Sequence, residues 1–255
     1  MTYKIKQLEK VSLNKPILIE GLPGIGNVGK IAADFIIDAI NAKKFIEIYS
    51  YNFPHAVFVN EKNMVELPII EMYYKKLKGN DLIILAGDIQ PIDESSCYEF
   101  CDKVLDIFQE LKGREVLTIG GIGLQQIPKD PKVYCTANTK KIIEKYRSKN
   151  LSNNIYGVVG PIIGVSGLLV GLSQLRSIPA MAILAETFGH PTYLGIRGAR
   201  EVLKVLNNKL EMNMDLSKLD EEIIEIEKAI KTKTKEFSEL QSKKDSKKNE
   251  TNYIG

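Results

Sequence analysis

Short apolar runs of strand length alternate along the chain with segments in which apolar residues recur every three or four positions. Several of the short runs, such as 81–88, are apolar almost throughout, which is typical of strands covered on both faces. We therefore expect an α/β fold in which a mostly parallel or mixed sheet lies between helices. The expected strands are 16–21, 44–51, 56–60, 67–74, 81–88, 115–121, 133–137, 155–160 and 180–188.

Segments with helical periodicity separate most of these runs. In the first of them Val28, Ile31 and Phe35 fall on one face of a helix. The runs between 44 and 74 follow one another without a helix, which predicts an antiparallel hairpin or meander inserted in the sheet. The expected helices are 27–41, 95–112, 139–149, 165–176 and 199–210.

The composition changes at 211–242, where apolar residues follow a heptad spacing and predict one long helix. Acids gather in its first half and lysines in its second, the order that the helix dipole favours. Residues 243–255 are polar apart from Tyr253 and Ile254 and predict a flexible tail. The chain is thus divided into an α/β domain at 1–210, this helix and the tail. The apolar seam, which we expect to be a helix interface, consists of Leu216, Leu219, Ile223, Ile226, Ile230, Phe237 and Leu240.

Composition and charge narrow the class of protein. With 44% hydrophobic and 26% charged residues among 255, the chain has the composition of an ordinary globular protein. Its net charge of +3 comes from evenly mixed lysines and acids, and it has no tryptophan, which argues against a nucleic-acid partner. Because no stretch approaches 18 uncharged apolar residues, we expect no membrane span and a cytoplasmic location.

The cysteines and histidines do not form an obvious metal motif. Cys97 and Cys101 are four residues apart in a helical pattern, which favours a buried helix face over a metal site or a redox pair. His55 and His190, the two histidines of the chain, each lie beside a proline in a predicted turn, where a structural role is the simpler interpretation. We therefore expect no metal and no cofactor.

A glycine-rich turn, GLPGIGNVG, follows the first predicted strand and opens the first predicted helix. Gly24, Gly26 and Gly29 fit the GxGxxG pattern that binds a pyrophosphate in dinucleotide-binding folds, and Glu47 lies at about the distance expected of the acid that binds the ribose. The alternative is that glycine is needed simply for a tight turn and for close packing of the helix.

Two carboxylates are predicted at the ends of strands. Asp88 ends one apolar run and Glu186 nearly ends another, at the sheet edge where open α/β folds bind their ligands. Such a pair could bind Mg²⁺ or act as a base, but each residue could also cap the segment that follows it. Ser166, in GVSGL, does not complete the GxSxG pattern of a nucleophile elbow. Since no nucleophile or base with an orienting partner accompanies the carboxylates, capping is the favoured interpretation.

Several of these segments together resemble the proteasome assembly chaperone family, the archaeal and bacterial relatives of the second eukaryotic assembly chaperone subunit. The resemblance covers about residues 15–210 and implies a three-layer α/β fold like that of purine nucleoside phosphorylases. It also implies homo-oligomerisation and binding to proteasome α subunits or to their ring in the 20S core. The segments that carry it are, in chain order, ILIEGLPGIGNVGKIAADFII, LAGDIQP, TIGGIG, GPIIGVSGLL and LAETFGHP followed by AREVLKVLNNKL.

The resemblance also implies a contact through the C-terminal residues. Members of the family often dock on the proteasome through a hydrophobic residue, then a tyrosine, then any last residue. Here the sequence ends with Tyr253, Ile254 and Gly255, so that the tyrosine stands third from the end. Either Tyr253 takes the hydrophobic position with Ile254 in the tyrosine position, or the motif is absent.

The resulting hypothesis is a non-catalytic assembly chaperone, a homo-oligomer that binds proteasome α subunits through its C-terminal helix and tail. The alternative hypothesis is a nucleotide-binding enzyme, either a dehydrogenase or a phosphorylase-like hydrolase. Such an enzyme would use the Gly24–Gly29 turn and the sheet edge at Asp88 and Glu186.

Overall fold

A computed structural model of the chain describes residues 3–224. The chain divides into two units, Met1–Met214 and Asp215–Gly255, and the fold given below is that of the first. In the second unit residues 217–224 are helical. Within residues 3–224 we find no helix that is both long and apolar enough to cross a membrane.

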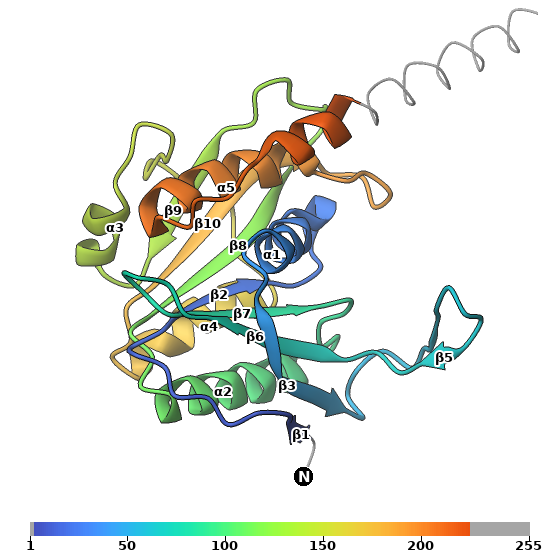
Figure 1. Ribbon diagram of the computed structural model, residues 1–255. Coiled ribbons are helices and arrows are strands. Elements are labelled where there is room, and N and C mark those ends of the chain that lie inside the picture. The colour runs from blue at the N-terminus through green and yellow to red at the C-terminus, as the bar shows by residue number, and fades with distance from the viewer. Residues whose placement is uncertain (1–2, 225–255) are drawn as a thin grey trace, which may run out of the picture. The chain divides into compact units, whose positions relative to one another are not determined.

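The first unit is built on an eight-stranded mixed sheet (Figure 1). Its strands are β1 (Tyr3–Gln7), β2 (Ile17–Gly21), β3 (Lys43–Ser50), β6 (Ile70–Lys75), β7 (Leu82–Gly87), β8 (Glu115–Leu124), β9 (Val133–Ala137) and β10 (Ala180–Phe188). They lie in the order β1-β3-β6-β7-β2-β8-β10-β9. The four central strands β7, β2, β8 and β10 are parallel, and the strands outside them pair antiparallel. The prediction of a mixed sheet with an antiparallel insertion is confirmed.

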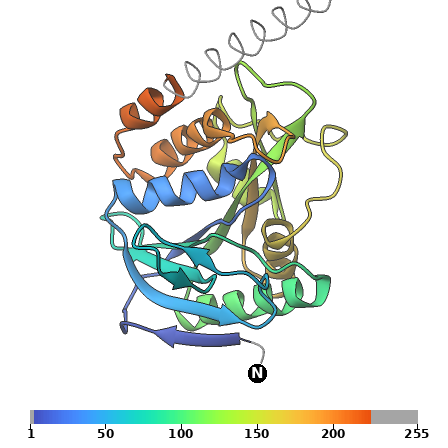
Figure 2. The same cartoon turned by 90° about the vertical axis from the view of Figure 1, so that its right-hand side faces the viewer.

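Helices cover both faces of this sheet, which gives the three layers that we expected (Figures 1 and 2). Helix α1 lies beside α5 and packs on β2, β7 and β8, while α2 and α4 lie together on the other face. A short 3₁₀ turn, η1, precedes α1, and α3 packs beside β9. The bounds are η1 (Ile25–Asn27), α1 (Val28–Ala39), α2 (Glu94–Glu110), α3 (Lys140–Tyr146), α4 (Val165–Leu175) and α5 (Ile196–Leu210).

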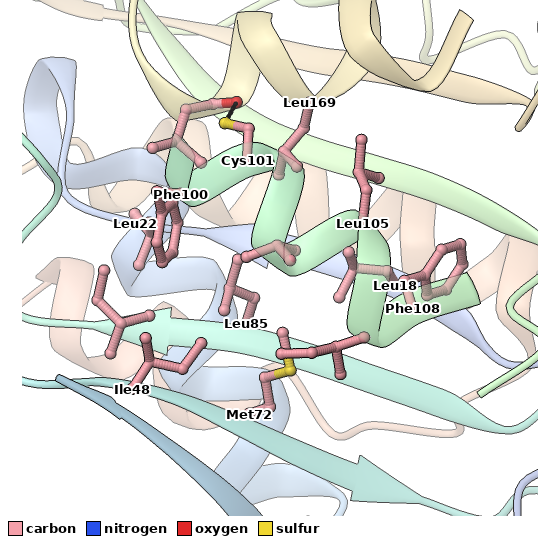
Figure 3. Close-up of a cluster of buried hydrophobic side chains, with 14 of the residues drawn as sticks. Leu18, Leu22, Ile48, Met72, Leu85, Phe100, Cys101, Leu105, Phe108 and Leu169 are labelled. Atoms are coloured by element: carbon pink, nitrogen blue, oxygen red, sulfur yellow. Dashed lines mark hydrogen bonds between the residues drawn. The ribbon is translucent and has the colours of Figure 1, made fainter. Parts of the chain in front are cut away.

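The main hydrophobic core lies between the sheet and the α2–α4 layer. Figure 3 shows Phe100 and Leu105 of α2 facing Leu18 of β2 and Leu85 of β7, and these four side chains are fully buried. Each such side chain stabilises the fold by about 1.5–3 kcal/mol relative to an exposed position. The helical spacing of apolar residues in α2 is therefore what fixes this helix on the sheet.

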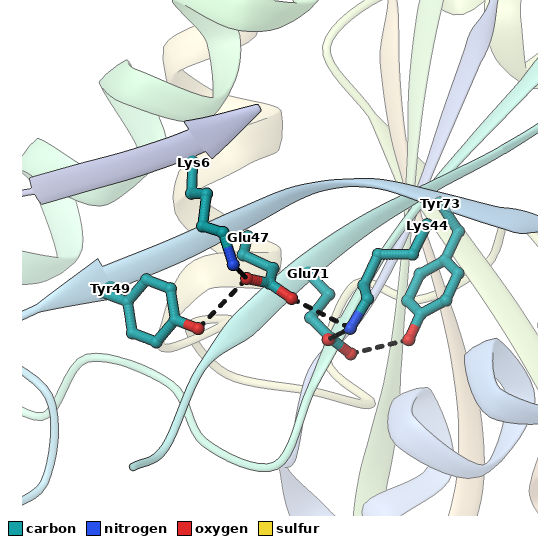
Figure 4. A network of polar contacts seen from close by, with 6 residues as sticks. All are labelled: Lys6, Lys44, Glu47, Tyr49, Glu71 and Tyr73. Atoms are coloured by element: carbon teal, nitrogen blue, oxygen red, sulfur yellow. Dashed lines mark hydrogen bonds and ion pairs between the residues drawn. The ribbon is translucent and has the colours of Figure 1, made fainter. Parts of the chain in front are cut away.

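The opposite face of the outer strands β1, β3 and β6 carries a polar network instead of a helix (Figure 4). Lys44 bonds Glu71 at 2.6 Å and Glu47 at 3.1 Å, and Lys6 bonds Glu47 at 2.9 Å. The hydrogen bond from Lys6 is the main reason that the pKa of Glu47 is lowered. Cross-strand pairs of opposite charge satisfy the carboxylates of Glu47, which is buried, and Glu71, which is partly buried, so this region of the sheet is stable with polar side chains on one face.

The fold differs from the sequence-based expectation most clearly at 155–160 and at the N-terminal strand β1, while β5 is a short strand outside the predicted ranges and the helix predicted from 211 begins at 217. The prediction of a strand at 155–160 is wrong, because this segment forms a turn in which Gly157 has a φ of +80° and the Tyr156 side chain is 99% exposed. The positive φ of Gly157 interrupts the extended backbone that a regular strand ladder requires. Strand β1, in contrast, is an additional edge strand that the apolar pattern did not predict, and it pairs antiparallel with β3.

Candidate functional site

The glycine-rich turn connects β2 to α1, as the sequence predicts. Close packing around the turn leaves no room for a side chain at two of its glycines. Gly26 has a φ of +62°, and a Cβ atom there would lie 2.6 Å from the hydroxyl oxygen of Thr187. A Cβ atom on Gly29 would lie 2.5 Å from the carbonyl oxygen of Ile119 in β8, so the third glycine lets α1 approach the sheet. These contacts account for two of the three motif glycines without a bound phosphate.

Glu47 does not lie where a ribose-binding acid would be needed. It is in the middle of β3, which is separated from β2 by β6 and β7. Its carboxylate accepts hydrogen bonds from Lys6 and Tyr49. The dinucleotide-binding interpretation therefore loses the acid on which it depended.

A cavity of about 560 Å³ opens beside the glycine turn, at the carboxyl ends of β2 and β8. Its walls come from the turn itself, from 119–123 of β8 and from the 158–163 segment. Among the described residues that line it none has a charged side chain, and the polar side chains are those of Gln90 and Ser166. The cavity is therefore suited to an uncharged group more than to a phosphate or a dinucleotide.

The side chain of Gln90, beside this cavity, links the turn that precedes α1 to the first residue of α4. Its amide nitrogen donates to the carbonyl oxygen of Pro23 in the glycine turn, at 3.0 Å. Its carbonyl oxygen accepts from the backbone nitrogen of Val165, the first residue of α4, at 3.4 Å. One side chain thus positions the turn before α1 relative to the start of α4.

Behind Ser166 lies a fully buried carboxyl group, that of Glu20 in β2. The Ser166 hydroxyl donates to Oε2 of Glu20 at 2.8 Å, and the backbone nitrogen of Leu22 donates to Oε1 at 3.1 Å. Burial raises the pKa of Glu20 from 4.5 to about 7, and these two hydrogen bonds oppose that rise. Glu20 was not among the residues predicted from the sequence, although it is the single glutamate in the apolar run PILIEG.

The two carboxylates predicted at the sheet edge are not brought together. Asp88 follows β7 and Glu186 lies in β10, and β2 and β8 separate these strands. Three strand spacings amount to roughly 14 Å, too far for both groups to bind one metal ion. Asp88 bonds the Lys30 side chain at 2.7 Å. Glu186 accepts from the backbone nitrogen of Lys132 and from the Tyr134 hydroxyl, so both carboxylates are used within the fold.

Asp88 does not cap the following helix, which corrects one of the interpretations given above. That role belongs to Asp93, whose carboxylate accepts a hydrogen bond from the backbone nitrogen of Ser96 at 2.9 Å. The cap lowers the pKa of Asp93.

The cysteines lie as the helical spacing predicted. Cys97 and Cys101 are buried on α2, and the Cys101 thiol donates to the carbonyl oxygen of Val165 at 3.8 Å. Burial raises the pKa of both thiols. His190 stacks on Phe188 and contacts Thr192, in keeping with a structural role. Within residues 3–224 no group of three or more His, Cys, Asp or Glu side chains could hold a metal ion.

The predicted partner-binding residues fall mostly beyond the stretch of chain that the structure describes. Leu216, Leu219 and Ile223 begin the heptad seam and are within it. The remaining seam residues, Ile226, Ile230, Phe237 and Leu240, lie outside the described residues, as do Tyr253, Ile254 and Gly255.

The Glu20–Ser166 pair has the distance of a nucleophile and its base, but the arrangement offers less than catalysis requires. Ser166 is the second residue of α4, and the described residues that line the cavity include no histidine that could carry a proton between the pair and a substrate. The Ser166 hydroxyl uses its one hydrogen to donate to Glu20. Toward the cavity it can therefore act only as a hydrogen-bond acceptor. The geometry supports binding of an uncharged donor more than attack on a substrate.

Comparisons with known proteins give a consistent picture. The model of the PAC2 family matches residues 18–233. The uncharacterized protein MJ1210 of Methanocaldococcus jannaschii is 28% identical over 239 residues, which is 94% of this chain and 90% of the relative. The crystal structure of Pyrococcus furiosus PbaB, an archaeal proteasome activator, is 33% identical with a TM-score of 0.83, covering 91% of this chain and 98% of the other.

A second solved structure shares the fold over the whole chain. It is Pyrococcus furiosus PbaA, described as an archaeal homolog of proteasome-assembly chaperone. The identity is 23%, the TM-score is 0.77, and all of both chains is covered.

Proposed function

This chain belongs to the PAC2 family, and we propose that it is a non-catalytic chaperone that binds proteasome α subunits, or the α ring of the 20S core, as a homo-oligomer. The observation that carries the proposal is the 33% identity to a proteasome activator, PbaB, over 91% of this chain. Such a protein would act in the cytoplasm, where proteasome subunits are assembled.

The described site is compatible with this role. Gly26 and Gly29, two of the three motif glycines, are required by close packing, and Asp88 and Glu186 are bonded to Lys30 and Tyr134. These observations favour a protein that presents surfaces to a partner over one that transforms a small substrate.

We assign the contact with the proteasome to the C-terminal segments. Tyr253 and Ile254 are the apolar residues of an otherwise polar stretch at 243–255, and the Leu216–Leu240 seam offers a second apolar surface. Several copies of such a segment in one oligomer would raise the effective concentration of each, so a weak single contact would become a strong one.

The decisive experiment is a pull-down of purified proteasome α subunits by the full chain, followed by titration to give a dissociation constant. We expect saturable binding that survives washing. In parallel, NAD and ATP are added in a thermal-shift assay, because the alternative function is a nucleotide-binding enzyme. A ligand present at 100 times its dissociation constant would stabilise the protein by about 2.7 kcal/mol. Lack of α-subunit binding together with a nucleotide-induced shift would replace the chaperone proposal with the enzyme.

A further inference from the structure

The connection between β3 and β6 leaves the sheet and forms an arm, residues 51–69 (Figures 1 and 2). Near its tip a pair of short strands, β4 (Phe58–Val59) and β5 (Val65–Glu66), forms an antiparallel ladder. A ladder of two residues in each strand is marginal in water when nothing packs against it. The arm therefore needs a further contact to be stable in this form.

The side chains of the arm are unusually apolar for an exposed segment. Six of them are between 42% and 68% exposed, and they come from both strands and from the residues beside them. Contiguous exposed apolar side chains mark interaction surfaces more often than ordinary protein surface. The six are Val57, Phe58, Val59, Met64, Val65 and Leu67.

A hollow of about 640 Å³ lies at the base of the same arm. Its walls include Tyr49, Tyr51, Phe53 and Pro54, and the Tyr51 side chain is 82% exposed. The hollow is thus an apolar concave surface, lined also by Val57 and Leu67, and the apolar side chains nearer the tip of the arm project beyond it. Two complementary surfaces on one molecule can form a contact between identical copies.

The charges of the two surfaces are complementary. The arm carries Glu61, Lys62 and Glu66, a net charge of −1. Among the described residues that line the hollow, the fully charged side chain is that of Lys4, whose ammonium lies 5.0 Å from the centre of the Tyr51 ring. An acidic arm would approach the cation at the hollow more readily than it would approach another arm.

We propose that two copies of this chain exchange arms, each arm lying with its apolar side chains in the hollow at the base of the other arm. The contact is isologous, so it occurs twice about one two-fold axis and covers both apolar surfaces of both copies at once. The inference builds on the proposed homo-oligomer and names the surface that forms it. The competing occupant is a proteasome subunit, which the experiment below separates from a second copy.

The first test measures the molar mass of the full-length chain by light scattering across a dilution series. Phe58→Glu and Val65→Glu place a charge on the arm, and we expect each to raise the self-dissociation constant at least tenfold. Leu175→Glu is the matched control, because Leu175 is 81% exposed but lies at the end of α4, away from the arm. Circular dichroism spectra of all variants must match that of the unchanged protein. An unchanged molar mass for both arm variants would overturn the proposal.

The second test identifies which surfaces meet. A chain carrying Val65→Cys is mixed with a chain carrying Ala56→Cys, a residue that lines the hollow, and the mixture is oxidised. The three native cysteines are buried, so the expected product is a disulfide between one chain of each kind. If the mixed product is no more abundant than with Leu175→Cys in place of Val65→Cys, the arm does not reach the hollow.

Pull-downs with α subunits distinguish failure of this inference from failure of the proposed function. Arm variants that dissociate but still bind α subunits support both proposals. If the arm variants keep their molar mass but no longer bind α subunits, the arm contacts the proteasome. That result would overturn the arm exchange. An unchanged chain that binds no α subunits refutes the chaperone function alone, since loss of the oligomer in Phe58→Glu would still show the arm contact.

Discussion

The hydroxyl of Ser166 donates a 2.8 Å hydrogen bond to the carboxyl group of Glu20, a residue 146 positions earlier in the chain. The contact joins the start of α4 to the central strand β2, so it ties one helix layer to the middle of the sheet. Within the described part of the chain no cation bonds this buried carboxyl, and a fully buried carboxyl without one is costly when ionised. This position should therefore control how stability depends on pH.

Replacing Glu20 with glutamine should remove a pH dependence of stability. In the folded protein the pKa of Glu20 is about 7, above its usual 4.5, so the folded state keeps a proton that the unfolded state releases. The contribution of Glu20 to the free energy of unfolding is fully present below about pH 4.5. It is lost as the pH rises through 7, and the total loss is about 3 kcal/mol. Urea unfolding at pH 5 and pH 8 should show the Glu20→Gln chain gaining stability relative to the unchanged chain at the higher pH.

The control for this experiment is Glu144→Gln, because the Glu144 side chain is 65% exposed. Its difference from the unchanged chain should stay nearly constant between the two pH values. Equal pH dependence in the Glu20→Gln and unchanged chains would mean that Glu20 is ionised in the folded protein at neutral pH.

Gly26→Ala should destabilise the fold by about 1–3 kcal/mol, because it forces a positive φ on alanine and brings a methyl group against Thr187. Gly24→Ala is the matched control, since its φ is −158° and a Cβ atom there meets nothing within 4 Å. Thermal unfolding with and without NAD or ATP measures both effects. A nucleotide-induced stabilisation that Gly26→Ala abolishes would show that the turn binds a ligand.

The three cysteines should be unreactive in the folded protein. Burial raises the pKa of each thiol, to about 11 for Cys135, so little thiolate forms at pH 8. Ellman's reagent should label them slowly under native conditions and fully in guanidinium chloride. Rapid release of one equivalent of chromophore from the native protein would contradict the buried environment of these thiols.

Replacing Tyr253 and Ile254 together with alanine should weaken binding to proteasome α subunits tenfold or more, which is about 1.4 kcal/mol. The oligomer and the melting temperature should stay unchanged, because neither side chain is assigned a role in the fold. Asn249→Ala with Thr251→Ala serves as the control within the same polar stretch. Superimposed binding curves for the double variant and the unchanged chain would move the contact to the globular unit or to the Leu216–Leu240 seam.

The sequence predicts the buried elements of this fold better than its exposed ones. The strands at 133–137 and 180–188 have the predicted bounds, since each is an apolar run with turns on both sides. Strand β1 was missed because only Tyr3 and Ile5 of YKIKQ are apolar, so the segment is too short and too polar to stand out as an apolar run. The false strand at 155–160 contains β-branched and aromatic residues that would suit a strand, but no neighbouring strand extends a ladder to it.

The site was harder to predict than the fold because its contacts are non-local. Asp88 and Glu186 share an edge of the sheet, yet their distance depends on a strand order that the local pattern does not contain. The role of Glu20 depends on its hydrogen bond with Ser166, which lies on a helix 146 residues later in the chain. Four of the six apolar residues of the arm, Val57, Phe58, Val59 and Leu67, were assigned to ordinary strands, since a run of apolar residues does not itself say whether anything covers it.

The place of β2 in the sheet also bears on how the chain acquires its structure during synthesis. Strand β2 ends at Gly21, but its neighbours are β7, which ends at Gly87, and β8, which ends at Leu124. At translation rates of about 5–20 residues per second, the ribosome needs roughly 5–20 s to make the segment from β2 to the end of β8. Early in that interval an apolar strand destined for the centre of the sheet has no native partner, and until β8 emerges one of its edges stays open. Strand β2, the first buried strand, can therefore have both neighbours in place only after β8 has been synthesised.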